Sequence, residues 1–148
     1  MNKSLNETEI RSLIPHAGGM CLWRSVEQWD AQQLQCRTDT HRDPRNPLRD
    51  AQGLSSIHLI EYGAQAIAIH GGLLARTSGA EKITPGFLAS VRNFVTEQQR
   101  IDQITDDLMV RARQLVANDS GSIYEFVIEA GGLRLASGRV SVVLRAQP

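Results

Sequence analysis

The sequence is poor in cysteine, in aromatic side chains and in any excess of one charge. Its two cysteines, Cys21 and Cys36, lie outside any CxxC pattern, and no second cysteine pair is present to complete a zinc site. We therefore expect reduced thiols, no bound metal and no other cofactor. Lys+Arg and Asp+Glu both total 16, so the formal net charge is zero. Nucleic-acid-binding proteins depend on a basic excess, and this balance therefore argues against a nucleic-acid partner.

A membrane-spanning stretch is also lacking. The longest apolar run, residues 57–74, is interrupted by Glu61, Gln65 and two histidines, which favours a core helix over a membrane span. Residues 1–9 are polar and acidic, unlike a signal peptide. We therefore expect a cytoplasmic protein with no membrane partner. The 148 residues, 41% of them apolar, predict one domain over residues 1–148 that buries about two thirds of its unfolded surface.

The periodicity of the chain predicts one long helix among antiparallel strands. From Ser55 to about Ala75, apolar side chains recur at helical spacing around most of the circumference, which predicts a largely buried helix capped by Ser55 or Ser56. Asn6 is expected to cap a short helix, and Gly131-Gly132 predicts a tight hairpin. Strands are expected at residues 20–29, 34–38, 86–95, 107–117, 122–130 and 133–144. This order predicts an α+β domain of the hotdog type, a long central helix wrapped by a curved antiparallel sheet.

Glu61 is the first candidate for chemistry, because it lies within the most apolar segment of the chain. A carboxyl group buried there must be paired, hydrogen-bonded or shifted toward its neutral form, and a neutral carboxyl group is a useful general acid. The alternative is a structural glutamate at a seam that water or a partner chain reaches. Gln65 follows one turn later and could hydrogen-bond Glu61, or could instead satisfy the backbone of a strand.

The four histidines offer weaker candidates. His41 lies in a charged loop, residues 39–53, where a histidine is usually solvated; long loops are often functional. His58 lies on the same side of the helix as Glu61, and His70 reads as a core or dimer contact. His16, between two chain breaks, is expected to pack or to cap. His58 and His70 are twelve residues apart, so the histidines show no metal-binding spacing, and no nucleotide or nucleophile-elbow motif occurs.

Three segments together resemble the 3-hydroxyacyl-carrier-protein dehydratases. They are Leu13-Ile14-Pro15-His16, the helix segment Leu59-Ile60-Glu61-Tyr62-Gly63-Ala64-Gln65-Ala66, and the strand from Gly86 to Phe94. The helix segment is similar to the Leu-x-Glu-(small or apolar)₂-Ala-Gln-Ala motif of that family. Among its subgroups, the chain most resembles the dehydratase-like subunits of aryl polyene biosynthesis.

This resemblance implies a hotdog dimer with its helices side by side and acyl tunnels at the interface. Glu61 would act as the acid opposite a loop histidine of the other chain, and the pair would dehydrate a 3-hydroxyacyl thioester on acyl carrier protein or coenzyme A. Ser56 and Ile57, at the start of the helix, would direct a backbone N–H to the thioester oxygen. Gln65 and Asn46 would complete the substrate-binding side chains.

One departure from the family pattern concerns the catalytic base. The usual Gly-His-Phe-Pro loop is absent, and the family's spacing from Glu61 reaches Asn46-Pro47, neither of which can accept a proton near neutral pH. His41 lies about five residues too early and is the one candidate base on the loop. Three hypotheses follow: a dehydratase subunit completed by a different hotdog chain, a non-catalytic acyl-binding or scaffold hotdog, and an acyl thioesterase. Homodimer and heterodimer both stay open.

Overall fold

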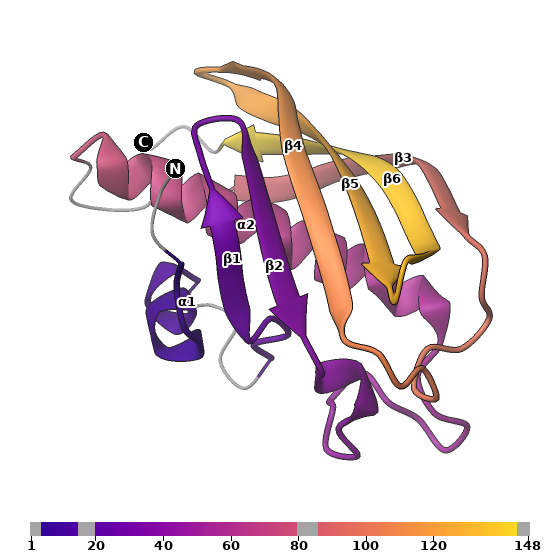
Figure 1. Ribbon diagram of the computed structural model, residues 1–148. Helices are drawn as coiled ribbons and strands as arrows, with labels where there is room; N and C mark the ends of the chain where they lie inside the picture. The colour runs from indigo at the N-terminus through magenta and orange to yellow at the C-terminus, as the bar shows by residue number, and fades with distance from the viewer. Residues whose placement is uncertain (1–3, 15–19, 80–85, 145–148) are drawn as a thin grey trace.

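A curved antiparallel sheet wraps one side of a long helix in the computed structural model, which describes residues 4–14, 20–79 and 86–144 (Figure 1). The α-helices are α1 (Glu7–Leu13) and α2 (Leu59–Thr77), and two short 3₁₀ helices are η2 (Thr40–Arg42) and η3 (Ser56–His58). The strands are β1 (Ser25–Trp29), β2 (Gln33–Thr38), β3 (Gly86–Thr96), β4 (Leu108–Asn118), β5 (Gly121–Ala130) and β6 (Leu133–Leu144). The predicted hotdog fold is confirmed.

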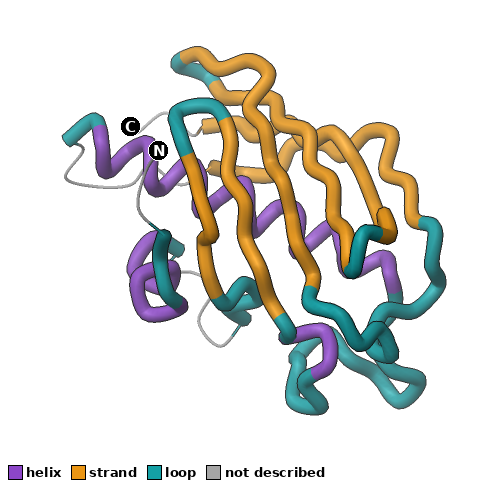
Figure 2. Tube along the Cα trace, in the orientation of Figure 1, coloured by secondary structure: helices purple, strands orange, loops and turns teal. Residues whose placement is uncertain are grey.

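The six strands form one sheet in the order β1-β2-β4-β5-β6-β3, with every neighbouring pair antiparallel. Figure 2 shows the strands curling around α2, so that the helix runs along the inner face of the sheet. On β5 the side chains that face α2 alternate with outward-facing ones, as a half-buried strand requires. The inward residues Tyr124, Phe126 and Ile128 are at most 2% exposed and form the centre of the core. β3 ends the sheet as an edge strand beside β6.

Local signals in the sequence are confirmed at both ends of the chain. Asn6 caps α1 in a reciprocal capping box with Glu9, at 2.9 and 3.2 Å. Gly131 and Gly132 turn the β5–β6 hairpin with φ of 57° and 82°, a conformation that side chains disfavour. The helix that was predicted to end near residue 75 ends at Thr77. His16 lies outside the described residues.

The first predicted strand is shorter than expected, because residues 20–24 are not in the sheet. Gln65 of α2 binds the backbone on both sides of this segment, accepting from the Leu22 N–H at 2.6 Å and donating to the Met20 carbonyl at 2.7 Å. The Leu22 carbonyl accepts from the Thr38 and Thr40 hydroxyls at 2.6 and 2.7 Å. Side chains thus satisfy backbone groups that a strand neighbour would otherwise satisfy.

The prediction that α2 is buried around most of its circumference is confirmed, but one narrow strip of the helix is not covered. One side packs on the sheet and is buried, including Tyr62, Gly63, Ala66, Ile69 and His70. The opposite side, which we call the open face, consists of exposed or half-buried residues of η3 and α2: Ile57, Glu61, Ala64, Ala68 and Gly71. The sheet curls around only one side of the helix, and no other described element of the chain covers the open face (Figure 1).

Candidate functional site

Glu61 lies near the N-terminal end of the open face, in the first turn of α2, and its side chain is exposed. Its expected burial within the chain's own core is therefore wrong. Ile57, one turn earlier on the same face, is 55% exposed although it is apolar. A carboxylate in the first turn is favoured by the helix dipole. The carboxyl group is thus accessible to a partner chain and to a ligand bound between the two chains.

Directly after Glu61, Tyr62 anchors the charged loop to the helix. Its hydroxyl lies 2.9 Å from the Thr40 hydroxyl and accepts from the Asn46 amide at 3.0 Å. Trp23 donates its indole N–H to the Tyr62 carbonyl at 2.8 Å and packs edge-on against the ring. Burial raises the pKa of Tyr62, so the ring stays neutral and acts as a structural hub. The loop is therefore fixed against the turn of α2 that carries Glu61.

Asn46, predicted to bind substrate, has its amide engaged within the chain. The amide nitrogen donates to Tyr62 and to the Thr40 carbonyl at 2.8 Å, and its oxygen accepts from the Leu48 N–H at 2.9 Å. Asn46 is also buried, at 7% exposure. Through these contacts Asn46 holds the charged loop together. A direct contact between Asn46 and substrate stays a prediction that this geometry does not support.

His41 is fully buried, so the expectation of a solvated loop histidine is wrong. Its Nε2 lies 2.9 Å from the Ile104 carbonyl, which requires the proton on Nε2 and joins the charged loop to the segment before β4. Burial lowers the pKa of His41 and keeps the ring neutral. A general base must reach the proton that it removes. The ring has no exposed surface in this chain, so its role as base stays a prediction without geometric support.

Gln65 does not make the expected hydrogen bond to Glu61, because both ends of its amide hold residues 20–22. The alternative drawn from the sequence, a polar side chain that satisfies backbone, is what the structure shows. His70 is likewise a core residue: its Nε2 donates to the Asp30 carbonyl at 2.8 Å, and its Nδ1 lies 2.6 Å from the Tyr124 hydroxyl. Burial lowers the pKa of His70.

The turn that begins the helix keeps one backbone donor close to the open face. The Ser55 hydroxyl caps the Ile57 N–H at 3.3 Å, whereas the N–H of the buried Ser56 donates to the Gln99 carbonyl at 2.9 Å. The Ile57 N–H therefore has the looser partner of the two. Of the predicted pair, only the Ile57 N–H could turn toward a substrate oxygen without breaking a strong bond. His58, in the same turn, is half-buried.

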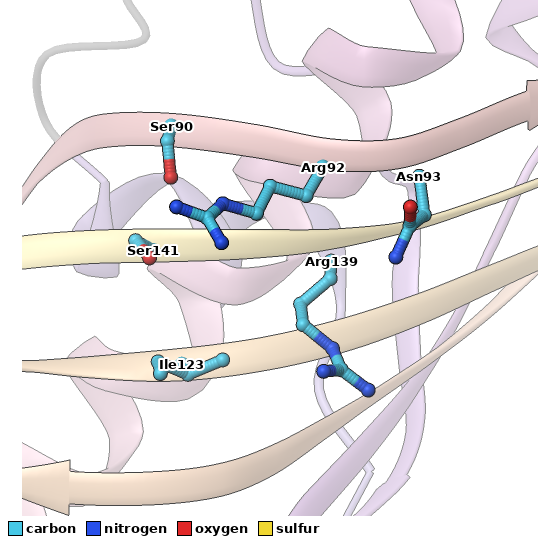
Figure 3. Close-up of a pocket in the computed structure, with 6 residues that line it drawn as sticks. All are labelled: Ser90, Arg92, Asn93, Ile123, Arg139 and Ser141. Carbon is cyan, nitrogen blue, oxygen red and sulfur yellow. The ribbon is translucent and has the colours of Figure 1, made fainter.

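Three further features concern metal ions, membranes and cavities. Among residues 4–14, 20–79 and 86–144, no three His, Cys, Asp or Glu side chains gather as they would around a metal ion. In the same residues, no helix is long and apolar enough to cross a membrane. A pocket of about 300 Å³ lies on the sheet, away from α2, and is lined partly by Arg92 and Arg139 (Figure 3). No pattern in the sequence indicates this pocket, because its residues come from three strands.

Comparison with known proteins supports a single family. A family profile described as ApeP dehydratase matches residues 8–148. No curated protein matched the sequence. Among solved structures, the chain is similar to a chain of the dehydratase heterocomplex ApeI:P from Xenorhabdus doucetiae, with a TM-score of 0.84 and 21% identity over 93% of this chain and 91% of that one.

More distant structural similarity extends to other hotdog proteins. The Escherichia coli PaaI protein from the phenylacetic acid degradation operon has a TM-score of 0.63 and 10% identity, over 92% of this chain and 90% of that one. A mutant thioesterase from Pseudomonas aeruginosa has a TM-score of 0.64 and 12% identity, over 97% and 98% of the two chains. At these identities the similarity establishes the fold.

Proposed function

Because the chain belongs to the ApeP-like dehydratase family, we propose that it is one subunit of a dehydratase whose active site is completed by a second hotdog chain. The chain contributes Glu61, and the partner contributes the base. The substrate is a 3-hydroxyacyl thioester carried by acyl carrier protein or coenzyme A, in a pathway of the aryl polyene type. The observation that carries the proposal is an exposed Glu61 on an otherwise apolar, uncovered helix face.

The open face is patterned for another helix. Its residues Ile57, Glu61, Ala64, Ala68 and Gly71 are spaced by four, three, four and three positions. That is the repeat with which two helices pack side by side at a shallow angle. Ala64, Ala68 and Gly71 are small, so a second backbone can come close, and an added Cβ at Gly71 would meet nothing within 4 Å. A partner helix laid here would cover Glu61 and enclose it among apolar side chains.

The free edge of the sheet supports the same partner. β3 is eleven residues long and, among the strands that the structure describes, pairs with β6 alone, so its other edge is free of strand pairing there. Natural proteins protect such edges, and pairing with another strand is one way to do so. A second hotdog chain could therefore cover the open face of α2 and extend the sheet at β3. The heterocomplex named for the similar Xenorhabdus doucetiae structure is consistent with two different subunits.

The loop residues of this chain favour a base on the partner. His41 is buried, and Asn46 cannot accept a proton near neutral pH. A base on the partner would remove the α-proton, and the electrons of that C–H bond would form the Cα–Cβ double bond. The C–O bond at Cβ breaks as Glu61 protonates the departing hydroxyl, which leaves as water. The Ile57 N–H at the helix start would stabilise the negative charge that develops on the thioester oxygen.

The proposal is tested by Glu61→Gln in the complex co-expressed with a candidate hotdog partner. We expect dehydration of a 3-hydroxyacyl thioester to fall by about 10²- to 10⁴-fold, the usual contribution of a general acid. The complex should remain intact, because the substitution keeps shape and removes only the proton donor. Activity is measured as formation of the enoyl thioester, and association by size-exclusion chromatography.

Glu27→Gln is the matched control, because Glu27 is also exposed but lies on β1, at the opposite edge of the sheet from β3. A second control is His58→Gln, which removes the histidine that lies nearest to Glu61 in sequence. Activity of the isolated chain that survives Glu61→Gln would contradict the proposal. Loss of activity in His58→Gln alone would place the base on this chain and remove the need for a partner base.

Two alternatives are separated by the same samples. The thioesterase among the structural relatives favours hydrolysis as a second candidate activity, and release of free carrier thiol from an acyl thioester would identify it. A non-catalytic acyl-binding or scaffold subunit predicts that Glu61→Gln leaves the activity of the complex unchanged, whereas disruption of the open face abolishes it.

A further inference from the structure

The outer face of the sheet carries a polar pocket that the proposed active site does not use. Its volume is about 300 Å³, at the lower end for small-molecule sites. It is lined by Ser90, Arg92, Asn93, Ile123, Arg139 and Ser141, from β3, β5 and β6. These side chains alternate along their strands with core residues such as Tyr124 and Val140, so they point away from α2. Figure 3 shows both arginine side chains extending over the neighbouring strands.

Two arginines occupy directly paired positions on neighbouring strands in this pocket. Arg92 of β3 is directly opposite Arg139 of β6 in the register, a placement that is unfavourable unless the charges are balanced. Glu125 is the next residue across the sheet, but its carboxylate pairs with Arg113 at 3.2 Å. In the described part of the chain, no carboxylate lies within salt-bridge distance of either guanidinium. An anion in the pocket would supply the missing charge.

A bulge in β3 brings a third polar group to the same place. The register shifts between Arg92 and Val95, and Asn93 has a φ of 54°, a left-handed conformation that asparagine tolerates better than most residues. Phe94 consequently packs inward, with its ring centroid 6.4 Å from that of Phe126. Arg92 and Asn93 therefore both line the outer pocket, although they are adjacent in sequence. A regular strand would have sent one of them into the core.

We propose that this pocket binds a phosphate group. Arginine presents a planar fork of N–H donors that matches phosphate oxygens, and the two guanidinium groups reach the pocket from neighbouring strands. The hydroxyls of Ser90 and Ser141 and the Asn93 amide add neutral donors around them. A concave site of this size fits a compact tetrahedral anion better than a flat acidic protein surface. The proposal is independent of Glu61 and of the proposed dehydration.

The test is a titration of the full chain, in complex with its partner if they copurify, with inorganic phosphate against chloride at constant ionic strength. We expect saturable binding by calorimetry and a rise in the unfolding midpoint. The double variant Arg92→Gln/Arg139→Gln should weaken binding at least tenfold. Arg134→Gln is the matched control, because Arg134 is an exposed arginine of β6 outside the pocket, and it should bind phosphate as the wild type does.

Coenzyme A and dephospho-coenzyme A identify the source of the phosphate. Tighter, arginine-dependent binding of coenzyme A than of its dephospho form assigns the pocket to the 3′-phosphate of that carrier. Equal, arginine-dependent binding of the two assigns it to the diphosphate that both carry, and binding of inorganic phosphate but of neither carrier assigns it to free phosphate. The proposal is overturned if phosphate does not saturate or if Arg134→Gln weakens binding as much as the double variant. The proposal is also overturned if polyglutamate binds through the two arginines and phosphate does not bind. That result would identify an acidic protein surface as the ligand. The unfolding midpoint in chloride shows that each variant is folded.

Discussion

Both sides of α2 carry glycine and alanine, but the surroundings of the two sides differ. The covered side places Gly63 so close to β5 that an added Cβ would lie 2.8 Å from the Phe126 ring. On the open face, Gly71 would meet nothing within 4 Å, and Ile57 is 55% exposed. Apolar and small residues on both sides mean that hydrophobicity alone does not distinguish the core of this chain from its uncovered surface.

The largest expected difference between the two sides comes from a buried charge. Ala66, on the covered side, is fully buried, whereas Ala68 is exposed on the open face. Ala66→Glu should cost about 4 kcal/mol or more, since an unpaired carboxyl group would enter the core. Ala68→Glu should change the stability of the isolated chain by less than about 0.5 kcal/mol. Denaturant unfolding of both variants measures the difference.

The same pair tests the partner surface. Ala68→Glu should prevent association with the second hotdog chain in size-exclusion chromatography, because it would place a second carboxylate one helical turn from the centre of the open face. Equal loss of stability in the two variants would contradict the assignment of the faces, and normal association of Ala68→Glu would show that the partner binds elsewhere.

A smaller and more specific contrast uses the two glycines. Gly63→Ala should destabilise the chain by about 1–3 kcal/mol, because the new methyl group collides with the Phe126 ring. Gly71→Ala should stabilise it by about 1 kcal/mol, since alanine is the better helix former and has room there. Thermal unfolding under identical conditions gives both values. The comparison of faces fails if the two substitutions have the same sign.

The smallest expected effect is a change of the unfolding free energy with pH, caused by the buried His70 on the covered side of α2. Burial lowers the pKa of His70, so the unfolded chain takes up a proton below its ordinary pKa of about 6.5 while the folded chain does not. The contribution of His70 is therefore fully present above pH 6.5. It is lost as the pH falls from there toward the lowered pKa, with a slope of at most about 1.4 kcal/mol per pH unit.

Replacement of His70 should flatten this acid slope. His70→Gln is expected to reduce the change in unfolding free energy between pH 7 and pH 5, and His58→Gln, at a half-buried position beside the open face, serves as the comparison. Chemical denaturation across this pH range is the measurement. An unchanged slope in His70→Gln would show that the ring is protonated in the folded chain, contrary to its burial.

Short-range features were the most predictable from sequence. The Asn6 cap, the Gly131-Gly132 hairpin and the long helix that carries Glu61 follow from residue type and spacing within a few positions. The role of Gln65 was open, because only the fold brings residues 20–22 to the helix. His41 was misjudged for the same reason: a charged loop predicts exposure, but the segment before β4 covers the ring.

The sequence by itself determined the order of the helices and strands, the antiparallel sheet around α2 and the family to which the chain belongs. It did so because these depend on periodicity, turn residues and a short motif that act locally. Only the tertiary structure decided that one side of α2 stays uncovered and carries Glu61, and that a bulge in β3 gathers Arg92 and Asn93 opposite Arg139. Those outcomes depend on which distant segments meet and on where the sheet ends, and no local pattern encodes either.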